Sequence, residues 1–137
     1  MTVYNKFTDP TTDVISWYKH VIHGAFWKYT GNKVVIDESV LESNDIICRI
    51  RKDEKFLENY QWIEVPSESK EEYFTLSKGD IIVKGEVDDE IDEYTRGQHS
   101  SDLVKKYKDL QGCLIVSEYT INTDGGRCNE HYYVKGE

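Results

Sequence analysis

Six carboxylates fall within the eight residues from Glu86 to Glu93, directly after an apolar, β-branched stretch at 81–83. Carboxylates at this density can bind calcium, act as a general acid–base pair, face an anion or a basic partner, or simply be solvated. A calcium loop of the EF-hand type needs glycine at its sixth position, and counting from Asp88 that position is Glu93. The spacing excludes an EF-hand and leaves a solvated loop or a surface with an electrostatic role.

Two further patterns have the residue types of catalytic or metal sites. His20 and His23 form an H-x-x-H, but residues three apart on a strand point to opposite faces. We interpret them as core or interface histidines. Ser67 to Lys70 spells S-x-x-K, but the chain lacks the S-D-N and K-T-G motifs that accompany it in penicillin-recognising enzymes, and we expect the pattern in a loop. We interpret the S-x-x-K pattern as a coincidence. We predict no catalytic, cofactor-binding or metal-binding residues, and no enzymatic activity.

Length and charge narrow the class of protein. The chain has 137 residues, which predicts one domain over 1–137, and a net charge of −9, which disfavours tight DNA binding. Its three cysteines, Cys48, Cys113 and Cys128, are odd in number and form no C-x-x-C pair, which favours reduced thiols. The N-terminus does not resemble a signal peptide, and no segment has the about 20 apolar residues of a membrane helix. We expect a soluble protein made in the cytoplasm.

The elements that must position these residues are mainly strands. Residues 45–51 alternate, with Ile46, Cys48 and Ile50 on one face, as a half-buried strand requires. Helical spacing of apolar residues predicts one short helix at about 101–111, and a long loop is expected at about 52–72. Further strands are expected at 2–7, within 14–29 with a bend at Gly24, after a Gly31-Asn32 hairpin turn, in a hairpin of 73–76 with 81–85, and in a terminal hairpin of 113–121 with 128–136.

The pattern predicts a mainly β fold: a small β-barrel or sandwich of seven to eight mostly antiparallel strands. Aromatic residues are abundant, among them Trp17, Phe26, Trp27, Tyr29 and Trp62. A small β core has limited room for so many large rings, so we expect at least one of them at a protein–protein interface.

Five blocks of the chain carry a likeness to a known group of proteins: "YNKFTDP" at 4–10, "VIHGAFW" at 21–27, "DIICRIR" at 45–51, "FTLSKGDIIVKG" at 74–85 and "YTINTDGGRCNEHYYVKG" at 119–136. In this order, over essentially the full length, the chain resembles small head-closure proteins (head–tail connector or stopper proteins) of tailed phages of Gram-positive bacteria. It departs from their pattern at Tyr132 and Tyr133, where they carry Trp, and at Lys52, where they carry Pro.

The resemblance implies a structural virion protein of the neck region, assembled in the host cytoplasm. Its subunits would form a homo-oligomeric ring beneath the portal or adaptor ring, close the DNA exit channel after packaging, and bind the tail terminator or tail tube on the other side. DNA would pass through the channel without being bound, because acidic walls would repel its phosphates. The residues expected at an interface or facing the channel are Trp62, Glu86, Asp88, Asp89, Glu90, Asp92 and Glu93.

Two alternatives remain open. A tail terminator or other tail-assembly protein has a similar size, and the helix expected at 101–111 is compatible with it. A small-molecule-binding β-barrel, or an enzyme of unknown class, would require a deep pocket with convergent carboxylates or a Cys–His pair.

Overall fold

Seven antiparallel strands form one sheet in the order β2-β1-β5-β6-β7-β4-β3. The computed structural model describes residues 1–36, 39–51, 54–108, 112–122 and 131–136. The strands are β1 (Thr2–Thr8), β2 (Ile15–Val21), β3 (Phe26–Ile36), β4 (Ser39–Arg51), β5 (Ile81–Val83), β6 (Cys113–Asn122) and β7 (His131–Gly136). The helices are α1 (Asn59–Trp62), the 3-10 helix η1 (Ser67–Glu72) and α2 (Ser100–Lys108). The mainly β prediction is confirmed.

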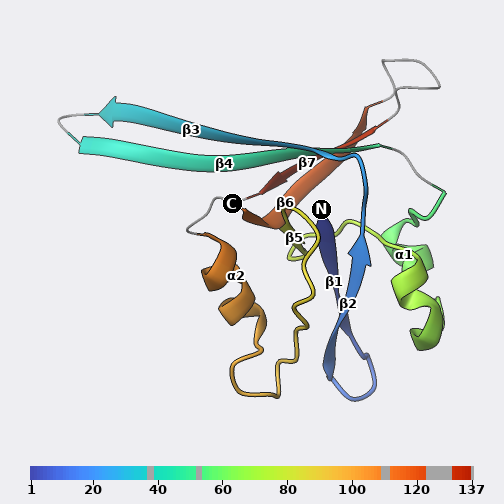
Figure 1. Ribbon diagram of the computed structural model, residues 1–137. Coiled ribbons are helices and arrows are strands. Elements are labelled where there is room, and N and C mark those ends of the chain that lie inside the picture. Colours follow the sequence, from blue (N-terminus) through green and yellow to red (C-terminus); the bar gives the residue numbers. More distant parts are fainter. Residues whose placement is uncertain (37–38, 52–53, 109–111, 123–130, 137) are drawn as a thin grey trace.

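The sheet bends at β6, which belongs to both of its halves. The first part of β6 pairs with β5, and the register then shifts between Val116 and Glu118 before β6 continues along β7. Gly136 pairs with Val116 at this bend, and a side chain there would collide with the Ile115 carbonyl. The β3–β4 and β1–β2 hairpins therefore run in crossing directions (Figure 1).

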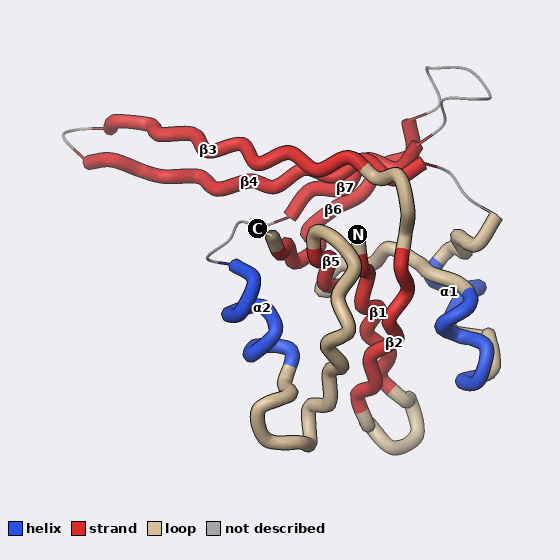
Figure 2. Tube along the Cα trace, in the orientation of Figure 1, coloured by secondary structure: helices blue, strands red, loops and turns tan. Residues whose placement is uncertain are grey.

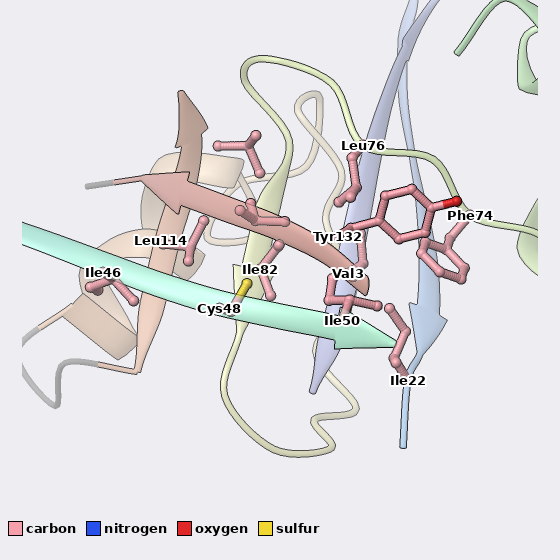
Figure 3. Close-up of a cluster of buried hydrophobic side chains, with 12 residues drawn as sticks. Val3, Ile22, Ile46, Cys48, Ile50, Phe74, Leu76, Ile82, Leu114 and Tyr132 are labelled. Atoms are coloured by element: carbon pink, nitrogen blue, oxygen red, sulfur yellow. The ribbon is translucent and has the colours of Figure 1, made fainter. Parts of the chain in front are cut away.

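The main core lies between the two halves of the bent sheet, as in a small β sandwich. Its side chains come from both halves and from the segment before β5, and most of them are labelled in Figure 3: Val3, Ile22, Ile46, Cys48, Ile50, Phe74, Leu76, Ile82, Leu114, Val116, Tyr132 and Val134. Each large aliphatic side chain buried in this way contributes about 2 kcal/mol. Within the described strands, β2 and β3 each pair with one neighbour, so the sheet is open and is not a closed barrel.

A second, smaller core covers the opposite face of β1, β5 and β6. Tyr4, Ile81 and Val83 pack there against Ile91 and Leu103, which come from outside the sheet. Leu103 is the buried residue of α2, whose apolar stripe the sequence predicted. Helix α2 and the loop that precedes it lie beside the β1–β2 hairpin in Figure 2. The half of the sheet formed by β1, β5 and the start of β6 therefore lies between two layers: the other half of the sheet on one face, and α2 with the loop before it on the other.

The β3–β4 hairpin extends well beyond the rest of the sheet (Figure 1). β3 pairs with β4 from Phe26↔Arg49 to Ile36↔Ser39, whereas β7 pairs with β4 only over 46–51. Residues 30–36 and 39–45 thus form a two-stranded ribbon whose backbone pairs with no third strand of the described chain. We call this ribbon the β arm.

Several expected elements are confirmed. β1, the strand over 45–51 with Ile46, Cys48 and Ile50 buried, β6 and β7 occur where the sequence predicted strands. Gly24, with φ +76°, makes the bend between β2 and β3. The helix expected at 101–111 is α2, of which 109–111 lie outside the described residues. The same is true of residues 123–127 of the turn expected at 122–127, and of Cys128.

Three expected elements are wrong. Gly31 and Asn32 lie inside β3, paired with Asn44 and Ser43, and make no hairpin turn. Residues 73–76 are not a strand: Phe74 makes a single parallel bridge to Phe56, and β5 pairs with β1 and β6 instead. The stretch 52–72 contains α1 and η1. At the start of α1 the Glu58 amide donates to Gln61 Oε1 at 3.3 Å, and η1 begins directly after Pro66, whose fixed φ favours the start of a helical turn.

Candidate functional site

The acidic segment, residues 86–93, folds back onto the protein. Ile91 is 9% exposed and packs with Val87 in the smaller core, against Tyr4 and Leu103. The hydroxyl of Thr2 donates to the Gly85 carbonyl over 2.8 Å and accepts from the Val87 amide over 3.2 Å. The Thr2 bonds fix the start of the segment to β1, and the burial of Ile91 holds its second half against the smaller core.

Asp89 lies at the centre of the contact between the acidic segment and α2. Its carboxylate accepts from Lys106 Nζ at 2.8 Å and from the Tyr107 hydroxyl, and its backbone carbonyl accepts from the Tyr4 hydroxyl at 2.6 Å. The Lys106 bond, followed by the Tyr107 bond, lowers the pKa of Asp89. Burial, and then the nearby Asp89 charge, raises the pKa of Tyr4. Asp89 therefore holds α2 against the sheet.

Glu93 links the acidic segment to the start of α2. Its Oε1 accepts from the Trp17 indole N–H at 3.1 Å and from the Ser100 backbone N–H at 2.7 Å. Burial by itself would raise the pKa of Glu93, but the bonds from Ser100 and Trp17 outweigh it and the pKa is lowered. A carboxylate at the first amide of a helix is favoured by both the free N–H groups and the helix dipole.

The other four acidic residues differ in their contacts. Glu90 pairs with Lys19 at 2.7 Å, and Glu86 lies 3.0 Å from His23 Nδ1. Asp92 accepts from the Tyr94 amide and the Thr95 hydroxyl, which shapes the following turn and lowers its pKa. Asp88 is exposed; its backbone carbonyl accepts from Lys19 Nζ at 3.5 Å, and its carboxylate forms no ion pair with a described residue. Five of the six carboxylates thus have partners within the chain, whereas Asp88 faces outward.

Trp62, which we expected at an interface or facing a channel, is fully buried. Its ring makes edge contacts with Phe7 and Tyr18, at centroid distances of 6.3 and 5.7 Å. Trp62 therefore offers no surface to a partner, and that expectation is corrected. The exposed large apolar residues near it are Tyr60, on α1, and Ile63, which directly follows α1.

Lys70, the last residue of the S-x-x-K pattern, is buried with an exposure of 2%. Its ammonium group donates to three carbonyls at and just after the end of α1: those of Trp62 at 3.2 Å, Ile63 at 3.1 Å, and Val65. The Trp62 carbonyl also accepts from the Val65 amide. Burial lowers the pKa of Lys70. The lysine caps a helix, so the structure gives this pattern a structural role.

The two histidines of H-x-x-H have separate partners. His20 Nδ1 donates to the Glu71 carbonyl at 2.8 Å, and its ring stacks on Phe74. His23 reaches the acidic segment. Within the described ranges, no group of three His, Cys, Asp or Glu residues has the arrangement of a metal site. Burial raises the pKa of the free thiols to about 12 for Cys48 and about 11 for Cys113.

A buried carboxylate, Asp80, joins the "SKGD" turn to β1. Its oxygens accept from Asn5 Nδ2 at 2.8 Å, the Lys6 amide at 3.0 Å and the Ser77 amide at 2.9 Å, and the residue is 1% exposed. Asn5 also donates to the Thr75 carbonyl at 2.7 Å. Burial raises the pKa of Asp80 to about 6, against the lowering effect of these N–H bonds. The network explains why this turn is close to β1.

A groove of about 470 Å³ lies between α2 and the sheet, and sequence reasoning missed it. Lys105 and Lys108 stand three residues apart on α2, a spacing that places them on one helix face. Lys6, on β1, joins them only in the folded chain. The helical spacing was visible in the sequence, but the third lysine and the groove itself were not.

Taken together, these features define an open β sandwich with a projecting β arm, an acidic segment fastened over one face, and a lysine-lined groove beside α2. The chain belongs to a family of unknown function, DUF6751, whose model matches residues 1–137. No curated protein and no solved structure matches the chain. None of the helices in the described ranges has the length and apolar character needed to cross a bilayer.

Proposed function

We propose that this protein is a structural virion protein of a tailed phage. It acts as a ring-forming head–tail connector subunit that closes the head after DNA packaging and joins it to the tail. In this role it binds the portal or adaptor ring on the head side and the tail terminator or tail tube on the other, and DNA passes through its channel. The sequence resemblance to head-closure proteins motivates the proposal, and the β arm carries it.

The β arm supports an assembly role because a two-stranded ribbon is marginally stable by itself in water. Seven pairs, from Thr30↔Asp45 to Ile36↔Ser39, lie beyond the end of β7 pairing. Their outer backbone groups pair with no other described strand, and they can pair with a strand or pack on a surface of another subunit. An arm of this length is well suited to reach a neighbour in a ring.

The charge of the chain is compatible with a channel through which DNA slides. The net charge is −9, and the exposed Asp88 carboxylate forms no ion pair with a described residue. Acidic walls repel phosphates, and they therefore keep a passing duplex from binding. In this proposal the exposed edge of the acidic segment faces the channel or a basic surface of a partner ring.

Shortening the β arm tests the proposal. Replacing residues 31–44 by Asn-Gly joins Thr30 to Asp45 through a two-residue turn and keeps all pairing of β4 with β7. We expect this variant to fold, as judged by circular dichroism and thermal unfolding, and to be absent from purified virions. Thr11→Ala, in the exposed β1–β2 turn, serves as the control. If the shortened chain enters virions normally, the β arm is not needed for assembly. If the unaltered chain is absent from virions, the proposed function is wrong.

A tail terminator is the second candidate, favoured by one observation. Helix α2 packs on the face of the sheet through Leu103, against Ile81, Val83 and Cys113. A helix packed on a sheet is the arrangement we expect of tail-tube-type folds. Electron microscopy of virions with the labelled protein separates the two candidates, since a terminator lies at the tail end of the neck.

A further inference from the structure

The groove beside α2 has an apolar floor. Trp17, Ile81 and Val104 line it together with Ile115, which is 39% exposed although it lies on a central strand. Its volume of about 470 Å³ lies within the range of pockets that take a ligand or large side chains. An exposed apolar surface of this kind, rimmed by charge, is typical of an interaction site.

Three lysines, Lys6, Lys105 and Lys108, stand at this groove. Their ammonium groups form no ion pair or hydrogen bond with any described residue, whereas the nearby Lys19 and Lys106 are paired with the acidic segment. These three lysines stand out on a chain with a net charge of −9 because none forms an ion pair with a described residue, although the charge of Lys6 also acts on the buried Asp80 carboxyl. The groove is therefore suited to an apolar segment that carries carboxylates.

The chain itself presents such a segment over residues 60–72, from α1 through η1. We call this segment the acidic helical face. Tyr60 is 69% exposed and Ile63 is 43% exposed. Four exposed glutamates follow them in sequence, and none of their carboxylates forms an ion pair with a residue that the structure describes: Glu64, Glu68, Glu71 and Glu72. The acidic helical face thus combines an aromatic and an aliphatic side chain with four negative charges.

The two surfaces lie on opposite flanks of the molecule. In Figure 1, α2 lies on one side of the β1–β2 hairpin and α1 on the other. Complementary surfaces on opposite flanks cannot satisfy each other within one chain. They can pair between copies, head to tail, and such heterologous contacts generate rings when the rotation closes.

We propose that the acidic helical face of one copy docks into the lysine groove of the next copy. Tyr60 and Ile63 would enter the apolar groove, and the glutamates would pair with Lys6, Lys105 and Lys108. This contact would be the one between neighbouring subunits of the proposed connector ring, and in that respect the inference rests on the proposed function. Because part of the attraction is electrostatic, association weakens as salt concentration rises.

Charge reversal on each side tests the contact. Lys105→Glu/Lys108→Glu alters the groove, and Glu68→Lys/Glu71→Lys alters the face; all four side chains are exposed, so both variants keep the fold. We expect each variant to self-associate at least about tenfold more weakly than the unaltered chain in sedimentation velocity at low salt. The control Lys84→Glu/Arg96→Glu reverses two exposed charges elsewhere and should associate normally.

Mixing the two variants is the decisive measurement. The groove variant retains an intact acidic face, and the face variant retains an intact groove, so the mixture should recover association that neither has alone. Failure to recover, self-association of both variants at the unaltered strength, or an unaltered chain that stays monomeric at its highest soluble concentration would overturn the contact. Binding of only an unrelated acidic peptide by a monomeric chain would overturn it as well.

Virion incorporation, scored separately, keeps this inference distinct from the proposed function. If both charge-reversed variants enter virions normally, the contact is wrong but the connector role stands. If the unaltered chain associates through this contact but never enters virions, the contact stands and the connector role is wrong.

Discussion

The pH dependence of folding provides a direct test of the buried network around Asp80. This carboxyl is 1% exposed, and burial raises its pKa from the ordinary 3.8 to about 6. A carboxyl with a raised pKa binds its proton more tightly in the folded chain than in the unfolded chain. Its contribution to stability is therefore fully present below pH 3.8 and is lost as pH rises through about 6.

The magnitude follows from the size of the pKa change. Each pKa unit corresponds to about 1.36 kcal/mol, so a rise from 3.8 to about 6 corresponds to about 3 kcal/mol of folding free energy. Asp80→Asn removes the titration. The amide also places an NH₂ group against N–H donors, which lowers the stability of the variant by the same amount at every pH. This constant loss does not affect how the stability difference between the two chains changes with pH.

The assay is urea unfolding of the unaltered chain and of Asp80→Asn between about pH 3.5 and about pH 7.5. We expect the stability of the unaltered chain relative to the variant to fall by about 3 kcal/mol as pH rises across this range. Asp13→Asn, in an exposed turn with φ +57° that Asn tolerates, controls for the loss of one carboxylate. A difference that is flat, or that grows toward neutral pH, would refute the reasoning, because it would mean that the three N–H bonds outweigh burial.

Two further predictions concern Trp62 and the acidic segment. Trp62→Ala should lower the free energy of unfolding by about 3–5 kcal/mol in urea denaturation, because it empties a fully buried site; an unchanged unfolding midpoint would contradict its place in the core. Asp89→Asn should cost about 1 kcal/mol, since it weakens the bonds to Lys106 and Tyr107, whereas Asp88→Asn should leave the thermal midpoint unchanged. Equal effects at these adjacent residues would show that the acidic segment is not fastened through Asp89.

Local patterns were sufficient to predict most strands and α2. Alternation in 45–51 fixes which side chains are buried, because successive strand residues face opposite sides whatever the sheet pairs with. The stripe that includes Leu103 predicted α2 for the same kind of reason, since helical spacing places apolar residues on one face. The hairpin predicted for 73–85 is wrong because β5 pairs with β1 and β6, which are distant in sequence. Local sequence patterns do not show which distant strand a segment pairs with.

Residue types and their alternation along the chain are enough to predict a mainly β protein with a strongly acidic segment after a buried strand. The contacts of the acidic segment follow from the fold instead. Its partners Trp17, Lys19 and Lys106 are distant in sequence from the carboxylates that they bind, and folding alone brings them together. Charge density along a chain predicts contact with water, but an ion pair depends on the positions of both groups, and those positions are a property of the fold.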